Sequence, residues 1–267
     1  MTAGTVAAGA LGGVAGYSIS ESEGIGTNPF TVCLERLPSE FNGLRIALLT
    51  DLHHGYFITR EHIDRAVQLT ISLKPDLILL AGDFIHNDPA YIAPVMAELG
   101  KLRAPLGVFA VQGNRDIKIN RMMTSQELAK NDIHEITNRG CWIQKGNSRF
   151  WLCGLDDCTL GRPDFAGALK GFSGDGPILA LTHSPHLADS IGGMNISLLM
   201  CGHTHGGQLN LPLIGRPFIP KGCENYPCGL IQGPHSKVFV SVGVGSVFPA
   251  MRLGCPPEVA LLTLANA

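Results

Sequence analysis

The chain has 267 residues, of which 45% are hydrophobic and 16% charged, and its formal net charge is −2 with ten neutral histidines. This composition is typical of a globular protein and excludes a disordered chain. Because there is no basic excess, it also argues against tight binding to the phosphates of a nucleic acid. The length allows one large domain or at most two small ones.

The first residues of the chain, 1–19, are apolar and rich in Gly and Ala, and the first basic residue is Arg36. A signal peptide begins with positive residues, and a membrane span needs about 20 strongly apolar ones. We expect residues 1–39 to be the remnant of a signal or membrane anchor whose basic part precedes the printed start. This favours a membrane-associated or exported protein of a bacterium. The alternatives are a flexible tail and a cytoplasmic location.

From residue 40 onward the pattern becomes one of short apolar runs separated by helical stretches, which predicts a single domain over residues 40–267. Residues 44–50 and 76–81 read as buried strands. Between them, residues 60–73 have apolar side chains at helical spacing, with Thr59 as the N-cap. Alternating strands and helices are typical of parallel strands covered by helices.

The rest of the chain continues this pattern and becomes richer in strands. Helices are predicted at 90–102 and 121–133. Further strands are predicted at 107–112, 149–155, 178–182, 197–201, 237–243 and 259–264. So many strands indicate a second sheet packed on the first, and therefore an α/β fold.

Five polar clusters follow directly on these apolar strands. They are Asp51-Leu52-His53, Gly82-Asp83, Gly113-Asn114-Arg115-Asp116, His183 and Gly202-His203-Thr204-His205. In open α/β sheets, ligands bind beyond the carboxyl ends of the strands. We therefore expect these side chains to converge on one place.

The residue types in these clusters indicate a metal centre. Oxygen and imidazole donors without thiolate suit Mn, Fe, Zn or Mg better than a structural zinc site. In D-x-H and H-x-H the two side chains of each pair point to one face of an extended chain. Seven donors are too many for one tetrahedral ion, but they suit two ions that share a carboxylate. Two such ions commonly hydrolyse phosphate esters, with an in-line attack on phosphorus by a hydroxide held between them.

Each cluster taken alone has an ordinary structural explanation. An Asp after a strand often forms a turn, Gly-Asp is a common turn dipeptide, and one His is more often a core or surface residue than a ligand. The ordered set is much harder to explain in this way, because Gly202 to His205 places two histidines in a glycine-bounded loop.

With these motifs the chain resembles the calcineurin-like metallophosphoesterase superfamily, and within it the bacterial YaeI/YkuE-type phosphodiesterases. The resemblance extends over residues 44–264. Its most specific stretches are KPDLILLAGD (74–83), LMCGHTHGGQLNLPLIGRPF (199–218) and VGVGSVFPAMRLGCPPEVALLTL (242–264). It implies a four-layer αββα sandwich, in which two mixed β-sheets are flanked by helices.

The resemblance also implies the roles of single residues. One metal ion would be held by Asp51, His53, Asp83 and His205, and the second by Asp83, Asn114, His183 and His203. Asp83 would bridge the two ions, and Asp116 would orient a neighbouring residue. The ions would be two divalent metals, Mn, Fe, Zn or Mg, and manganese is favoured.

The chain departs from the superfamily at Arg115, because most members have GNHD where this sequence has GNRD. A guanidinium cannot donate a proton usefully at neutral pH, but it can bind a phosphate oxygen. The GNRD motif is similar to that of UDP-2,3-diacylglucosamine hydrolases, whose leaving group is already acidic. This favours a pyrophosphate or another activated diester as substrate. His54 and His86 lie beside the motifs as alternative proton donors, and His54 could contact substrate.

The leading hypothesis is therefore a two-metal phosphodiesterase or pyrophosphatase that acts on a small or lipid-linked substrate. Its catalytic residues would be Asn114, Arg115, Asp116 and His183. One alternative is the UDP-2,3-diacylglucosamine pyrophosphatase of lipid A synthesis. A second is a non-catalytic interaction protein with the same fold, and a third is an amide or ester hydrolase. Tight binding of nucleic acid is not expected, and membrane association is left open.

Overall fold

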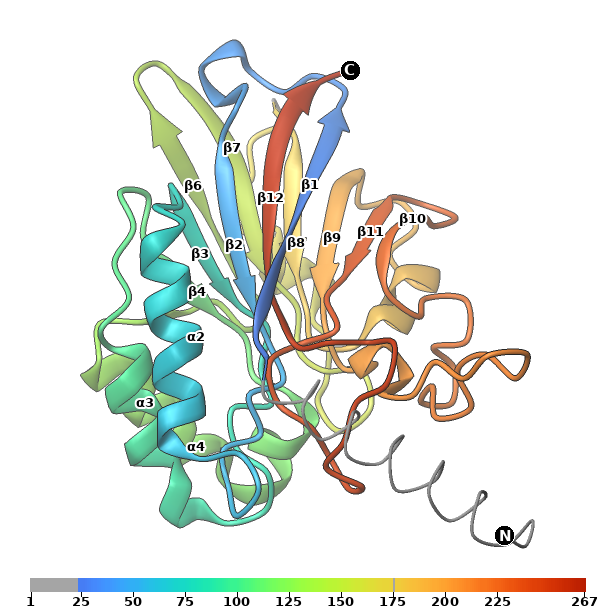
Figure 1. The fold of residues 1–267 in the computed structure, drawn as a ribbon. Helices are drawn as coiled ribbons and strands as arrows, with labels where there is room; N and C mark the ends of the chain where they lie inside the picture. The colour runs from blue at the N-terminus through green and yellow to red at the C-terminus, as the bar shows by residue number, and fades with distance from the viewer. Residues whose placement is uncertain (1–23, 175) are drawn as a thin grey trace, which may run out of the picture.

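The computed structural model describes residues 24–174 and 176–267, which form two β-sheets that lie face to face with helices outside them (Figure 1). The first sheet has the strand order β1-β12-β2-β3-β4-β5. The second has the order β10-β11-β9-β8-β7-β6. Both sheets are mixed, so the predicted α/β sandwich of two mixed sheets is confirmed.

The strands of the first sheet are short except at one edge, where β1 and β12 pair over nine residues. Their bounds are β1 Gly26–Leu34, β12 Glu258–Asn266, β2 Arg45–Leu49, β3 Leu77–Leu80, β4 Val108–Ala110 and β5 His134–Glu135. In the second sheet they are β10 Gly229–Gln232, β11 Lys237–Val240, β9 Ile196–Cys201, β8 Ile178–Leu181, β7 Ser148–Gly154 and β6 Arg139–Lys145.

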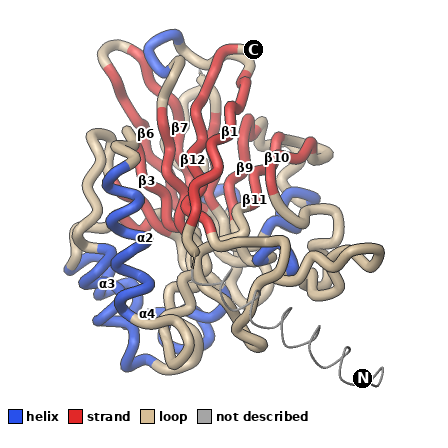
Figure 2. Tube along the Cα trace, viewed as in Figure 1, coloured by secondary structure: helices blue, strands red, loops and turns tan. Residues whose placement is uncertain are grey.

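Helices cover the two outer faces unequally, as the blue segments of Figure 2 show. The first sheet is covered by α2 (Arg60–Ser72), α3 (Ile92–Leu99) and α4 (Asn114–Lys130). The second has only the short α5 (Phe165–Ala168) and the 3₁₀ helix η3 (Pro185–Asp189). The remaining 3₁₀ turns are η1 (Ser39–Phe41), η2 (Pro89–Tyr91) and η4 (His205–Gly207).

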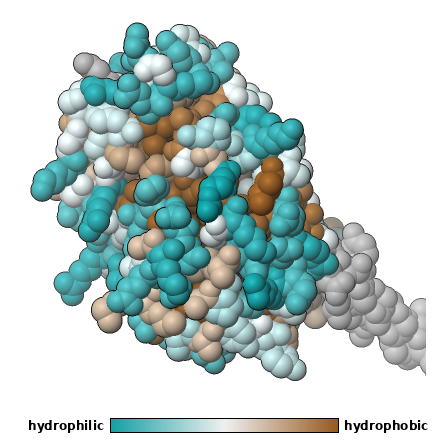
Figure 3. Space-filling model, turned by 90° about the vertical axis from the view of Figure 1, so that its left-hand side faces the viewer, coloured by the Kyte–Doolittle hydropathy of each residue, from teal (hydrophilic) through white to brown (hydrophobic). Residues whose placement is uncertain are grey.

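The largest apolar cluster lies between the sheets and joins them. Leu79 of β3, Phe150 of β7 and Phe239 of β11 are all fully buried in it. Phe150 also packs edge-on against Phe41, with ring centroids 4.9 Å apart. Figure 3 shows a mostly hydrophilic surface on the side of the molecule to the left in Figure 1, with a brown area at the level of the sheets. Burial of the apolar cluster between the sheets is the main force that holds them together.

The predicted strands and helices are all present, with bounds shifted by a few residues. Thr59 is the N-cap of α2, and its hydroxyl accepts a hydrogen bond from the amide of His62 at 3.3 Å. The helix predicted at 121–133 begins earlier, at Asn114, because Gly113 and Asp116 form a capping arrangement there. The backbone of Asn120 departs from helical geometry, which divides the helix and hides its first turns from a periodicity search.

The first sheet begins before the predicted boundary at residue 40. Gly26–Leu34, which the sequence analysis assigned to the N-terminal segment, form β1 and pair in parallel with β12. Most of β1 is exposed, so its sequence lacks the continuous apolar run of a buried strand. Residues 1–23, with the predicted signal or anchor remnant, lie outside the described residues. No helix within the described ranges is long and apolar enough to cross a membrane.

Truncation of a side chain between the sheets should destabilise the protein strongly. We expect Leu79→Ala to lower the free energy of unfolding by about 2–5 kcal/mol, because it leaves a cavity in a fully buried site. Urea denaturation measures the change. The control is Leu160→Ala, whose side chain is 49% exposed and should cost far less. Equal effects of the two substitutions would contradict the prediction.

Candidate metal centre

The predicted donor residues all lie where strands of the two sheets end. Strands β2, β3 and β4 run parallel, and Asp51, Asp83 and Asn114 follow them in turn. Strands β8 and β9 are also parallel, and His183 and His203 follow them. The carboxyl ends of both sets meet at one edge of the sandwich, as ligand sites in α/β folds do.

The backbone turns sharply at most of these positions. Asp51, His53, Asp83, His203 and His205 all have φ between 49° and 69°, a left-handed conformation that non-glycine residues rarely adopt. Hydrogen bonds between neighbouring strand ends hold this backbone conformation. Examples are Asp51 N–H to Gly82 O at 2.9 Å and His53 N–H to Asp83 O at 3.0 Å. Residues held in such conformations cluster at functional sites.

Two glycines allow the loops to approach this closely. A Cβ atom on Gly113 would lie 2.2 Å from Oδ1 of Asp83. One on Gly202 would lie 2.3 Å from Oδ2 of Asp51. No real Cβ contact is that short, so any side chain at either position would displace a carboxylate of the site.

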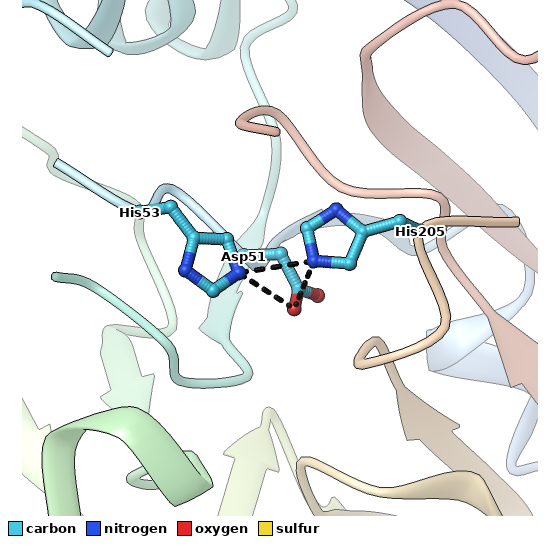
Figure 4. Close-up of side chains that lie close together, drawn as sticks. All are labelled: Asp51, His53 and His205. Atoms are coloured by element: carbon cyan, nitrogen blue, oxygen red, sulfur yellow. Dashed lines mark hydrogen bonds and ion pairs between the residues drawn. The ribbon is translucent and has the colours of Figure 1, made fainter. Parts of the chain in front are cut away.

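One group of donors consists of Asp51, His53 and His205, whose side chains point toward one another in Figure 4. Oδ1 of Asp51 lies 3.6 Å from Nε2 of His53 and 3.3 Å from Nε2 of His205. The two imidazole nitrogens are 3.0 Å apart. The other carboxylate oxygen of Asp51 accepts hydrogen bonds from the Thr50 hydroxyl and the His203 amide, both at 2.8 Å, and these fix its orientation.

The second group consists of Asp51, Asp83 and His183, and His203 lies beside it. Oδ2 of Asp83 lies 3.5 Å from Nε2 of His183, which is 3.1 Å from Nδ1 of His203. The same oxygen is 3.6 Å from Nε2 of His53. Asp51 thus belongs to both groups, and Asp83 lies within 3.6 Å of a histidine of each, His53 and His183.

The chemistry of these donors fits divalent metal ions. Oδ1 of Asp51 and Oδ1 of Asn114 are buried and have no hydrogen-bond partner among the described residues. Nδ1 of His183 lies 2.7 Å from the Ala81 carbonyl, which can only accept, so this nitrogen carries a proton and Nε2 is the ring atom that faces Asp83. Buried polar atoms without partners are costly, and a shared cation would satisfy all of them.

The pKa values of four donors, Asp51, Asp83, His203 and His205, favour the protonation states that bind a metal ion. Burial would raise the pKa of Asp51, but the neighbouring His205 holds it well below its usual value. His183 likewise outweighs burial and lowers the pKa of Asp83 to about 2. Burial lowers the pKa values of His203 and His205 to about 4. These two carboxylates are thus ionised and these two imidazoles neutral at pH 7.

His183 and Asp116 have raised pKa values. For His183, burial opposes the charged form, but Asp83 outweighs it. For Asp116, burial and the nearby Asp83 raise the pKa to about 8. Asp116 is fully buried, and its oxygens accept hydrogen bonds from the Phe84 amide at 3.0 Å and the Gly113 amide at 2.9 Å. These hydrogen bonds hold the backbone next to Asp83 and Asn114.

The donors open into a cavity of about 220 Å³ with one polar and one apolar wall. Arg115 lines it, and its amide donates to Oδ1 of Asp83 at 2.8 Å. The sequence did not predict the apolar wall. It consists of Phe218, Pro220, Val247, Phe248 and Pro249.

His54, which the sequence predicted to contact substrate, is not among the residues that line the cavity. Its side chain is buried, its Nδ1 lies 2.8 Å from the Ile58 carbonyl, and its ring packs edge-on against Tyr91. His86 is half-buried, with its ring centroid 5.7 Å from that of His53.

Arg252 is a residue of the site that the sequence analysis missed. It is fully buried behind His205, with Nη2 3.3 Å from Nδ1 of that histidine. Its guanidinium also donates to carbonyls at both ends of one loop, those of Val242 at 2.8 Å and Cys255 at 3.1 Å. A single Arg in an apolar stretch gives no sequence signal for this, because its partners are backbone atoms.

The fold and the site together define a metal-dependent phosphoester hydrolase. Residues 44–207 match the family model described as calcineurin-like phosphoesterase, and the chain belongs to this family. The predicted resemblance to the superfamily and the prediction of an enzyme are thereby confirmed.

The curated relatives agree with this assignment. The chain is 33% identical over 224 residues to phosphodiesterase YaeI of Escherichia coli (strain K12), covering 82% of each chain. It is 30% identical over 270 residues to the uncharacterized metallophosphoesterase YkuE of Bacillus subtilis (strain 168), covering 98% of this chain and 94% of the relative. Among solved structures, TT1561 of Thermus thermophilus shares the fold at 14% identity, with a TM-score of 0.50 over 75% of this chain and 90% of that one.

A methyl group at Gly113 should disrupt the centre. We expect Gly113→Ala to lower the affinity for Mn²⁺ by at least about tenfold, because the new Cβ would meet the Asp83 carboxylate. Isothermal titration of metal-stripped protein measures this. The control is Gly26→Ala, where the nearest atom would be 3.9 Å from the added Cβ. Unchanged Mn²⁺ binding by Gly113→Ala would contradict the proposed place of Asp83.

Proposed function

We propose that the protein hydrolyses a phosphodiester or pyrophosphate bond at a centre of two divalent metal ions, with manganese favoured. The observation that carries this is the place of Asp83 Oδ2, which faces His53 on one side and His183 on the other. One ion would be held by Asp51, His53, Asp83 and His205. The other would be held by Asp83, Asn114, His183 and His203.

Bound metal ions would activate water and neutralise charge on the phosphoryl oxygens. The chain supplies the rigid frame for this chemistry. The amide of Arg115 and the backbone around Asp116 hold the carboxylate of Asp83 in place, and the Ala81 carbonyl orients His183. Such fixed orientation is what makes electrostatic stabilisation effective in a transition state.

Arg115 would bind the phosphoryl group and stay charged throughout. Arg115 lines the cavity together with Asn114 and Asp83. Because it cannot give up a proton at neutral pH, it cannot serve as the general acid that an alkoxide leaving group requires. The site therefore favours substrates whose leaving group is already acidic, such as a pyrophosphate or an aryl phosphodiester.

A second candidate function is the cleavage of UDP-2,3-diacylglucosamine, a pyrophosphate that carries acyl chains. The apolar wall of Phe218, Val247, Phe248 and Pro249 beside the donors favours it. The same apolar wall also fits a lipid-linked substrate, association with a membrane, and a membrane or exported location in a bacterium. A non-catalytic role has less support, because the donor residues of both proposed ions converge on one site.

Removal of the bridging charge should abolish turnover. We expect Asp83→Asn to lower Mn²⁺-dependent hydrolysis of a p-nitrophenyl phosphodiester by at least about a hundredfold, since even outer partners of metal ligands contribute ten- to a hundredfold. The assay uses metal-stripped protein with Mn, Mg, Zn or Fe added back. As a control, Asp64→Asn removes an exposed carboxylate on α2. Full activity of Asp83→Asn would disprove the two-metal proposal.

Replacement of Arg115 by histidine should change the preference for the leaving group. We expect Arg115→His to increase the rate on an alkyl phosphodiester relative to the p-nitrophenyl ester, because an imidazolium can protonate an alkoxide. The ratio of kcat/KM for the two esters measures this. Arg103→His on the exposed surface is the matched control. An unchanged ratio would show that Arg115 does not determine the leaving group.

A further inference from the structure

Large apolar side chains are exposed around the mouth of the metal centre. Six of the ten that are exposed within the described ranges lie on three segments beside it. They are Tyr56 (84% exposed), Phe57 (51%), Leu213 (108%), Ile214 (71%), Phe218 (58%) and Phe248 (80%). Scattered single residues of this kind are ordinary, but a group gathered around a site marks an interaction surface.

The three segments are attached directly to the centre. Tyr56 and Phe57 follow His53 along the chain, and Phe218 and Phe248 line the cavity. The two later segments are joined by hydrogen bonds from Gln208 to the Val247 carbonyl at 3.1 Å and from the Asn210 amide to the Leu253 carbonyl at 2.7 Å. Figure 1 shows all three segments below the ends of the sheets.

Leu213 is the least expected residue of this rim. It lies at the tip of a turn closed by Leu211 and Gly215, with φ at 67° and its side chain fully exposed. A glycine or asparagine would suit such a backbone, and a polar residue would suit such exposure. Leucine in water is unfavourable here, both for this backbone conformation and for this exposure. This indicates that the side chain enters a less polar environment than water.

The chain enters the fold at the same edge. Strand β1 runs antiparallel to β2, so Gly26 lies where β2 ends and the metal centre begins. The preceding residues 1–19 are apolar in composition. Residues 210–221 contain no acidic residue, and their exposed cation is Lys221, because the guanidinium of Arg216 donates to the Gly206 carbonyl. Apolar tips beside a cation complement a surface of anionic phosphate headgroups over acyl chains.

We propose that this rim docks on a lipid bilayer, with Leu213, Ile214 and Phe248 entering the headgroup region, so that the metal centre opens onto the membrane surface. The proposal deepens the proposed function by naming the substrate class, a phosphoester of a membrane lipid. Docking itself does not depend on turnover and is measured separately. Projecting tips on three loops suit a soft lipid surface better than a second protein, whose interface needs a packed core.

Vesicle binding tests the docking surface. The full chain should cosediment with phosphatidylglycerol–phosphatidylcholine vesicles, and Leu213→Ser/Ile214→Ser should weaken this partitioning by about tenfold. Hydrolysis of a water-soluble ester should not change, because neither residue lines the cavity. The control is Ile71→Ser, which is 40% exposed at the end of α2 away from the site. No binding by the full chain, or equal binding by the variant, would overturn the proposal.

A second measurement locates the contact. Tryptophan fluorescence of Ile214→Trp should be quenched by vesicles with brominated acyl chains, and that of Ile71→Trp should not. Two native tryptophans give a background that the unmodified protein corrects. If Ile214→Trp escapes quenching, or if Leu213→Ser/Ile214→Ser changes only the oligomeric state, the rim contacts something other than lipid. Loss of turnover with normal vesicle binding would instead refute only the proposed chemistry.

Discussion

The whole centre depends on the fixed orientation of one carboxylate, that of Asp83. The Arg115 amide holds one of its oxygens, and the other stands between the imidazoles of His53 and His183. These two histidines come from different sheets, because His53 follows β2 and His183 follows β8. The packing of the sheets therefore determines the geometry of the site. The apolar core between the sheets holds the polar donor groups close together at the edge of the sheets. Without this support, like charges would move apart and charged groups would be solvated by water.

Much of this could be predicted from sequence because each donor follows an apolar run that can only be a buried strand. Asp51, Asp83 and His183 lie together for that reason, since the ends of parallel strands converge. Strand β1 was not predicted, because an edge strand lacks the continuous apolar run of a central one. The start of α4 at Asn114 was missed because the kink at Asn120 interrupts the helical period.

Two contacts near the site could not be predicted from short motifs. His54 has a residue type that suits substrate contact, yet its Nδ1 lies 2.8 Å from the Ile58 carbonyl. Arg252 has no acidic neighbour in the sequence, yet it is buried against carbonyls of Val242, Gly245 and Cys255. Such contacts depend on the path of the backbone, which short sequence motifs do not encode. A buried cation is tolerable only when it is fully hydrogen-bonded, as here.

The position of Arg252 links the metal donors to the apolar rim. It contacts Nδ1 of His205 on one side and closes the loop from Val242 to Cys255 on the other. That loop carries Val247, Phe248 and Pro249, which form the apolar wall of the cavity. The polar and apolar walls thus share one rigid support, and a substrate with a phosphate at the donors would have its apolar part directed along the loop. The buried guanidinium therefore ties His205 of the polar wall to the loop that carries part of the apolar wall.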